Sequence, residues 1–246
     1  TSKGEIQTEQ MAGDMQEQEE IKIAELVENT NNEETTGEIS RDYEIKDEET
    51  WDISANGDGS VKAKWTLKDR TLTISGTGEI KDWDINSKED WHNTQYTNLI
   101  ENIIIQEGIT NIGKYAFDNC NNLKSVNLPE GVTSIKEQAF FRCNSLTNIS
   151  IPQTVNYIGT QAFSGCSNLT NITIPEGVTS IEDSTFSGCS RLESIDIPSM
   201  VTNIGKKVFN DCDNLESINV NSNNPSYYSE NGILFNKEKT KIIVYP

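Results

Sequence analysis

Apolar and small polar residues recur along the middle of the chain in one fixed order. A phenylalanine is followed three residues later by a cysteine, three residues after that by a leucine, and then by two apolar positions that alternate with polar ones. The five cysteines mark this order at intervals of 23 residues: Cys120, Cys143, Cys166, Cys189 and Cys212. A fixed interval of this length predicts a stacked array of repeats, because a single globular core leaves no such period.

The alternating apolar pairs predict one short strand in each repeat, with one face buried. These pairs are Val126 and Leu128, Ile149 and Ile151, Ile172 and Ile174, Ile195 and Ile197, and Ile218 and Val220. In four repeats a proline follows and ends the strand, because proline lacks an N–H group. Since one repeat cannot bury its own apolar face, we expect successive strands to stack about 4.8 Å apart.

The column of cysteines could in principle form disulfides, bind zinc or stay reduced. Stacked cysteines would keep their Cβ atoms about 4.8 Å apart, beyond the ~3.8 Å mean of a disulfide, and five is an odd number. A zinc site usually has thiolates about two to four residues apart. We therefore expect reduced, buried thiols that behave as small hydrophobic side chains and do not react in the folded protein.

Composition changes before the repeats. Residues 1–50 hold 16 acidic and 4 basic residues, which is −12 of the chain's net charge of −19. These residues include few apolar side chains, so folding would bury too little apolar surface to offset the entropy lost on ordering, and we expect a mostly disordered acidic tail. A short helix from Asp14 to Asn29 is the alternative. A chain this acidic repels the phosphate backbone, which argues against a nucleic-acid partner. No run of about 18 apolar residues is present that could span a membrane.

The pattern L-x-x-[VI]-x-[LI]-P-x-x-V-x-x-I-x-x-x-[AV]-F-x-x-C over about residues 97–220 resembles the BspA-type leucine-rich repeats of bacterial and some protozoan surface proteins. The resemblance implies a leucine-rich repeat solenoid, mainly β with short helical turns, with 23-residue repeats flanked by β-hairpin caps. The chain departs from better-known leucine-rich repeats where these carry Asn or Cys, so their horseshoe curvature is not assumed. At those positions it has Gly131, Thr154, Gly177 and Met200.

Two flanking segments also resemble that family. Residues 65–83 look like the β-rich segment that precedes such arrays, with strands on either side of a tight turn at Lys68 and Asp69. Residues 224–246 look like a hairpin unit, with strands "ILFN" and "KIIVYP" about a "KEKT" turn. We therefore divide the chain into an acidic, mostly disordered tail (1–50), a β-rich N-terminal capping segment (51–96), five repeats plus a final strand (97–220) and a C-terminal β-hairpin unit (221–246). The resemblance also implies further repeats or an anchoring module beyond Pro246.

Candidate catalytic and metal-binding residues are few. His92 is the only histidine and has no serine or cysteine motif beside it, so we interpret it as a capping or surface residue. The stretch "DISANGDGS" begins like a calcium loop at Asp52, but Ala63 stands where the loop needs a bidentate glutamate, and we interpret the stretch as a turn. We predict no catalytic residue, no metal site and no cofactor.

Side chains between the buried positions point away from the core and form two rows on the surface. We call this surface the strand face; its residues are Ser125, Asn127, Asn148, Ser150, Asn171, Thr173, Ser194, Asp196, Ser217 and Asn219. One interpretation is that small polar side chains only solvate the strands. The other is a shallow protein-binding platform, although it lacks the Tyr, Trp and Arg residues that dominate binding hot spots.

These features favour a non-enzymatic recognition protein. The resemblance implies a secreted or cell-surface protein, its signal peptide removed, that adheres through its repeats to host extracellular-matrix or cell-surface proteins or to neighbouring cells. The alternative is a structural spacer that presents another module from the cell surface, with the acidic tail as a tether. A glycoside hydrolase would need a carboxylate pair about 5 to 9 Å apart in a cleft, and nothing in the sequence places one there.

Overall fold

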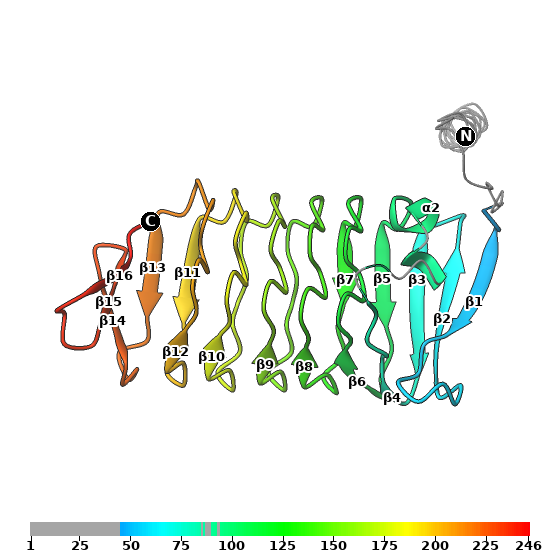
Figure 1. The fold of residues 1–246 in the computed structure, drawn as a ribbon, viewed down its shortest axis with the longest axis horizontal. Helices are drawn as coiled ribbons and strands as arrows, with labels where there is room; N and C mark the ends of the chain where they lie inside the picture. The colour runs from blue at the N-terminus through cyan, green and yellow to red at the C-terminus, as the bar shows by residue number, and fades with distance from the viewer. Residues whose placement is uncertain (1–44, 85, 87–89, 93) are drawn as a thin grey trace, which may run out of the picture. The chain divides into compact units, whose positions relative to one another are not determined.

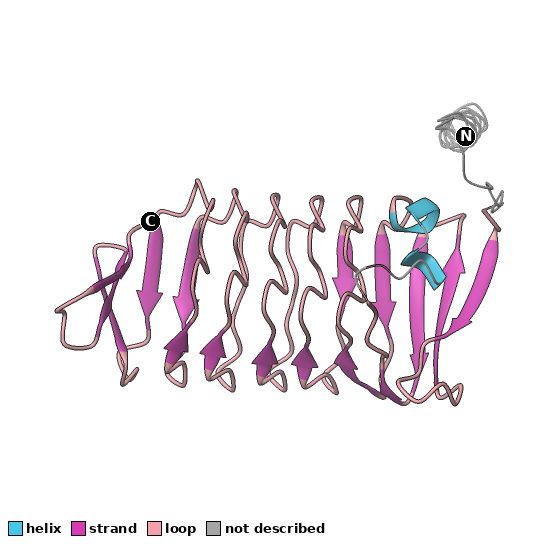
Figure 2. Ribbon diagram, in the orientation of Figure 1, coloured by secondary structure: helices cyan, strands magenta, loops and turns pink. Residues whose placement is uncertain are grey.

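The structure, a computed structural model, describes residues 45–84, 86, 90–92 and 94–246. The chain divides into two compact units, residues 1–45 and 46–246, and every described helix and strand lies in the second. The helix considered for Asp14–Asn29 lies outside the described residues. The second unit consists mostly of strands (Figure 2), with a 3-10 turn at Asp90–His92 (η1) and a short α-helix at Thr94–Thr97 (α2).

A five-stranded sheet begins this unit (Figure 1). Its first three strands are antiparallel, and two strands from the repeats extend it in parallel. In order across the sheet they are β1 (Glu48–Asp52), β2 (Val61–Thr66), β3 (Thr71–Gly76), β5 (Asn102–Ile105) and β7 (Ser125–Asn127). The tight turn predicted between β2 and β3 is confirmed, since the Arg70 N–H donates to the Leu67 carbonyl at 3.2 Å.

β1 crosses the boundary that the sequence analysis drew at residue 50. Its first residue, Glu48, lies in the range assigned to the tail. The strand extends this far because Trp51 packs edge-on against the rings of Trp91 and Tyr96, at centroid distances of 5.7 and 5.3 Å. Contacts of this kind stabilise aromatic clusters beyond their area burial, and they hold β1 against the rest of the unit.

Residues 23 apart pair in parallel register in the repeats. On the strand face, β11 (Ser194–Ile197) pairs with β13 (Ser217–Val220). On a second side, β4 (Gly78–Glu79), β6 (Ile109–Ile112), β8 (Ser134–Ile135) and β9 (Tyr157–Ile158) form one sheet, and β10 (Ser180–Ile181) pairs with β12 (Asn203–Ile204). Figure 1 shows these strands side by side in chain order.

Two of the five predicted repeat strands are absent, so the prediction was wrong for residues 149–151 and 172–174. Successive repeats here share single hydrogen bonds: the Thr170 N–H donates to the Thr147 carbonyl at 3.1 Å, and the Glu193 N–H to the Thr170 carbonyl at 3.4 Å. The stacking of these repeats is instead held by backbone hydrogen bonds on the other sides, which the apolar alternation does not reveal.

The third side of the repeats is a series of turns joined by backbone hydrogen bonds, which we call the turn ladder. In one repeat the N–H groups of Gln138, Phe140 and Arg142 donate to carbonyls of the next repeat at 2.8–3.0 Å. Gln138 and Arg142 have left-handed φ values of 53° and 57°. The helical turns predicted within the repeats are therefore non-helical turns, bonded to the next repeat as well as within themselves, as where the Phe141 N–H donates to the Gln138 carbonyl at 3.2 Å. Equivalent donors lie at Tyr115, Phe117 and Asn119, at Gln161, Phe163 and Gly165, and at Ser184, Phe186 and Gly188.

Phenylalanine rings form a continuous column inside the repeats. Consecutive ring centroids from Phe117 to Phe209 are 5.4 to 6.0 Å apart. Trp91 stacks on Phe117 at 6.1 Å and extends the column by one ring. Removing one internal ring, as in Phe163→Ala, leaves a cavity that costs about 3 to 5 kcal/mol.

The cysteines line the core beside this column. All five are free thiols, four buried and Cys212 half-buried, which confirms the expected column of buried thiols. Their role as plain small hydrophobes needs correction, because each described thiol after the first donates to the carbonyl of a phenylalanine 26 residues earlier. Cys143 Sγ lies 3.2 Å from the Phe117 oxygen, and Cys166 Sγ lies 3.2 Å from the Phe140 oxygen. The same bond recurs at Cys189 and Cys212.

A three-stranded antiparallel sheet follows the last repeat. It consists of β14 (Tyr227–Glu230), β15 (Ile233–Asn236) and β16 (Ile242–Val244). The predicted strands on either side of "KEKT" are confirmed as β15 and β16. The Ile218 N–H of β13 donates to the Gly232 carbonyl at 2.9 Å, which joins this sheet to the repeats.

Candidate protein-binding surface

The ten predicted residues of the strand face lie on one side of the repeats. Nine of them are exposed and Ser217 is half-exposed. At the C-terminal end the rows are linked across strands, since Ser194 pairs with Ser217, and the Asn219 Nδ2 donates to Asp196 Oδ1 at 2.9 Å. At the N-terminal end Ser125 Oγ donates to Asn102 Oδ1 at 2.7 Å, so the rows continue onto β5.

The middle of the strand face is bonded differently. Asn148 and Asn171 each donate to the threonine just before them, at 3.4 and 3.2 Å, rather than to the next repeat. Ser150 and Thr173 are exposed on backbone that forms no strand. Side chains here are therefore less constrained by their neighbours than those at the two ends.

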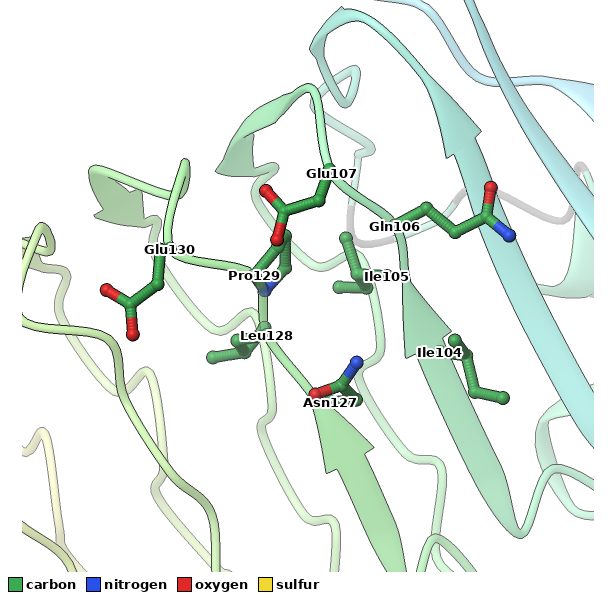
Figure 3. A pocket seen from close by; sticks show the side chains of 8 residues that line it. All are labelled: Ile104, Ile105, Gln106, Glu107, Asn127, Leu128, Pro129 and Glu130. Atoms are coloured by element: carbon green, nitrogen blue, oxygen red, sulfur yellow. The ribbon is translucent and has the colours of Figure 1, made fainter.

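A hollow of about 550 Å³ borders the strand face at β5 and β7 (Figure 3). Ile104 and Asn127 lie side by side across the two strands, and Ile104 is 42% exposed. Glu107 and Glu130 place two carboxylates at the rim, with Pro129 between them (Figure 3). An exposed isoleucine beside a hollow is the kind of apolar anchor that the polar rows lack.

Sequence reasoning missed Ile104. It lies 23 residues before Asn127 and so belongs to the second row of the strand face. The sequence analysis began the rows at Ser125 and included no residue of this segment. Extending the rows by one period toward the N-terminus would have found it.

Ionic contacts connect the residues just before β3, β5 and β7, the strands at this end of the strand face. The Glu101 carboxylate contacts both the Arg70 guanidinium and Lys124 Nζ, the latter at 2.6 Å. Burial alone would raise the pKa of Glu101, but hydrogen bonds from Lys124 and Arg70 outweigh it and the pKa is lowered. These contacts hold the edge of the face in one arrangement.

His92 is buried, so its interpretation as a possible surface residue was wrong. Its ring lies beside Trp83 and Trp91, with centroids 4.6 and 5.4 Å away. Its Nε2 donates to the Tyr115 carbonyl at 2.8 Å and lies 3.7 Å from Asp118 Oδ1. Sequence analysis could not predict this burial, because it depends on Trp83 and on the first repeat.

The calcium-like stretch is a turn closed by its own hydrogen bonds. Asp52 Oδ1 accepts from the Ser54 N–H at 3.0 Å and from Ser54 Oγ at 2.5 Å, and Ser54 Oγ accepts from the Gly59 N–H. These bonds lower the pKa of Asp52. Across the part of the chain that the structure describes, no group of three or more His, Cys, Asp or Glu residues could hold a metal ion. Nor does any described helix have the length and apolar character to cross a membrane.

Comparisons with known proteins agree on the repeat family. The profile of the BspA type leucine rich repeat region matches in six copies, over residues 92–216 and 138–243. A leucine-rich repeat protein from Eubacterium ventriosum is 32% identical with a TM-score of 0.70, and the match covers 81% of this chain and 51% of that one. A leucine rich cell surface protein from Faecalibacterium prausnitzii is 27% identical with a TM-score of 0.53, over 77% of this chain and 60% of that one.

A third structure shows the fold alone. The leucine rich repeat protein of T. pallidum is 24% identical with a TM-score of 0.51, over 65% of this chain and 79% of that one. A search of curated proteins gave no match. This chain spans about half the length of the Eubacterium structure and three fifths of the Faecalibacterium structure. The order of its apolar positions, its strand-rich repeats and the profile match together place the chain in the family of BspA-type leucine-rich repeat proteins.

Proposed function

We propose that this chain is a non-enzymatic recognition protein whose strand face binds other proteins. The observation that carries the proposal is the exposed row of small polar side chains that ends at Ile104 and the hollow beside it. Exposed polar rows provide hydrogen-bonding groups in fixed register, and the isoleucine provides apolar surface that would be buried from water on binding.

We further propose that the repeats form a solenoid with a 23-residue period. The parallel registers on the strand face and the second side support it, since Ser194 pairs with Ser217 and Ser134 with Tyr157. In this proposal residues 51–96 and 221–246 cap the edges of residues 97–220, and residues 1–50 form the acidic tail. Covered edges are what a repeat array needs to stay soluble.

The proposed location is the cell surface or the extracellular medium. The Faecalibacterium relative is described as a cell surface protein, which supports this. The proposed partners are host extracellular-matrix or cell-surface proteins or those of neighbouring cells, as the family resemblance implies. A structural spacer is the second candidate, favoured by the self-bonded middle of the strand face.

A binding screen against immobilised matrix and cell-surface proteins at physiological salt tests the proposal. The variant Thr173→Arg with Ser194→Arg places two bulky cations on the strand face and should abolish saturable binding. The matched control, Asn156→Arg with Thr179→Arg, changes exposed residues on other sides of the repeats and should bind normally. Ile104→Asp should also weaken binding. Equal loss in the control, or binding to no target, would favour the spacer.

A further inference from the structure

The turn ladder ends without acceptors at the C-terminal repeat. In the two repeats before it, the Phe163 N–H donates to the Thr185 carbonyl at 3.0 Å and the Phe186 N–H to the Val208 carbonyl at 3.1 Å. The equivalent donors of the last repeat are Lys207, Phe209 and Asp211, and no described residue accepts a hydrogen bond from any of these three N–H groups. Three backbone donors in fixed register therefore remain open at this end.

A hollow of about 920 Å³ lies against two of these donors, Lys207 and Phe209. One wall is the last turn, residues 206–210, and the opposite wall comes from Tyr227 and from residues 243–245 near β16, at the end of the unit in Figure 1. The hollow occupies the position where a further repeat would stack on the turn ladder. Its lining is partly apolar, and Tyr245 is 74% exposed at its edge. Its volume lies in the range of roughly 300 to 1,000 Å³ typical of ligand sites.

The charge of this hollow is opposite to that of the whole chain. Lys206, Lys207 and Lys241 line it, and Asp183 is the one acidic residue in the lining. Asp183 Oδ1 already accepts the Lys206 N–H at 2.7 Å. Among the described residues, none of the three ammonium groups has a carboxylate within 4.0 Å. A ligand of complementary charge is therefore acidic.

A second copy of this chain does not complement the site. At the N-terminal end of the turn ladder, the carbonyls of Lys114 and Ala116 are already taken by the Trp83 N–H at 3.0 Å and by Trp91 Nε1 at 2.9 Å. Two C-terminal ends placed together would set donors against donors. The open groups need carbonyl oxygens that neither the described residues nor a second copy of them supplies.

We propose that this hollow is a second binding site, which takes an extended peptide segment with acidic and apolar side chains in alternation. Its backbone carbonyls accept from Lys207, Phe209 and Asp211, in the way that a strand adds to an open sheet edge. Alternate side chains of an extended peptide point in opposite directions. One set therefore meets the lysines and the other meets Phe209, Tyr227 and Tyr245. The site is separate from the strand face and does not depend on it.

The test uses the full chain and a fluorescein-labelled peptide in which glutamate alternates with isoleucine. Fluorescence anisotropy should show saturable binding, and a peptide alternating lysine and isoleucine should not bind. Amide hydrogen exchange should slow at Lys207, Phe209 and Asp211 when the acidic peptide is added. Amides at Ser184, Phe186 and Gly188, which are bonded already, should be protected with and without it.

A matched pair of variants separates this site from general electrostatics. Lys206→Gln with Lys241→Gln should weaken binding about tenfold, because it removes two exposed charge pairs with the peptide and each such pair contributes modestly to affinity. Lys62→Gln with Lys68→Gln removes the same charge from exposed positions around β2 and should leave binding unchanged. Equal weakening in both variants, or binding without protection of the three amides, would overturn the proposal. Protection that appears with rising protein concentration and no peptide would do the same, by showing that a second copy fills the site.

Discussion

The two ends of the turn ladder differ in whether their backbone groups have hydrogen-bond partners. At the N-terminal end its carbonyls accept from the Trp91 indole and the Trp83 backbone, and His92 donates to the Tyr115 carbonyl nearby. At the C-terminal end no described residue accepts from the N–H groups of Lys207, Phe209 and Asp211, and the first two of these residues line a hollow. The acceptors named at the N-terminal end of the ladder are therefore hydrogen-bonded, whereas the donors at its C-terminal end are not.

The difference follows from the polarity of the backbone. In the turn ladder each repeat directs N–H groups toward the C-terminal side and carbonyls toward the N-terminal side, so the two ends of the ladder need different partners. Trp91 suits the carbonyl end, because its N–H meets Ala116 while its ring covers Phe117. Buried polar groups need such partners, because leaving one unmet costs roughly 1 to 3 kcal/mol. At the C-terminal end the equivalent partner must supply hydrogen-bond acceptors, such as carbonyl oxygens, for the open N–H groups.

Breaking the closed end should have the largest effect. Trp91 is fully buried, so Trp91→Ala should lower the free energy of unfolding by about 3 to 5 kcal/mol through the cavity it leaves. Trp91→Phe keeps most of the ring but leaves the Ala116 carbonyl unmet, and should cost about 1 to 3 kcal/mol. Urea unfolding followed by circular dichroism measures both.

Trp51→Phe is the control for that experiment, because Trp51 belongs to the same aromatic cluster but is half-exposed and no hydrogen bond is described for its indole. It should cost less than Trp91→Phe. A Trp91→Phe protein as stable as the original would show that the indole N–H does not close the ladder.

The thiols should report the same contrast between the interior and the open end. Burial raises the pKa of Cys166 to about 12 and that of the half-buried Cys212 to about 11. Since the thiolate is the reactive form, a thiol reagent under native conditions should modify Cys212 first and leave the four interior thiols intact. Cys166→Ala should cost about 2 kcal/mol, through lost packing and the lost bond to Phe140, and Cys212→Ala less.

Mass spectrometry of the labelled protein and urea unfolding of the two variants give these results. Rapid modification of most of the five thiols would contradict the buried column. So would a Cys212→Ala protein that is the less stable of the two.

The period of the residue types predicted the stacking but not how it is bonded. Phe140, Cys143 and Leu146 are buried as the pattern requires, because apolar spacing reports burial directly. The turn ladder was invisible because its left-handed positions carry Gln138, Arg142 and Ser184, residue types that rarely adopt this conformation, rather than a consistent glycine. Backbone donors have no residue signature, so the open end could not be seen either.

The candidate surface was found in part for a similar reason. The polar rows follow from strand alternation, whereas Ile104 broke the polar pattern and was overlooked. The hollow beside it depends on the turn that leads from β5 to β6, and its rim residues Glu107 and Glu130 are recognisable only once that turn is built. The sequence period predicts which side chains share a row, whereas the conformation of the turns determines where the surface has a hollow.

A smaller effect should come from Asp118, next to His92 at the closed end. Burial raises its pKa to about 6, and the hydrogen bond from Asn119 offsets only part of this. Because the folded pKa lies above the unfolded value, the folded state binds more protons between about pH 4 and pH 6, and stability falls as the pH rises through this window.

Asp118→Asn should therefore be more stable than the original at pH 7.5, by about 1 kcal/mol after allowance for partial exposure, and should lack that pH dependence. Thermal unfolding between pH 4 and pH 7.5 measures it. The comparison is Asp211→Asn, which removes an exposed carboxylate from the last turn and should leave the pH dependence that Asp118 causes in place. If the stability of the Asp118→Asn protein changed with pH in the same way as that of the original protein, the raised pKa of Asp118 would not be the cause.

The smallest predicted effect concerns Lys207, a left-handed residue of the last turn, with φ of 55°. A non-glycine residue pays about 1 to 2 kcal/mol in this conformation, and glycine loses about 0.5 to 1 kcal/mol of chain entropy on folding. Lys207→Gly should therefore stabilise the protein by about 0.5 kcal/mol, or about 1 to 2 °C in Tm. Lys206→Gly removes the same charge at a residue without positive φ and should destabilise it. A loss in both variants would show that the turn is not strained; a gain at Lys207 alone would show that the open end keeps the strained geometry of the interior turns although no described residue accepts from the Lys207 N–H.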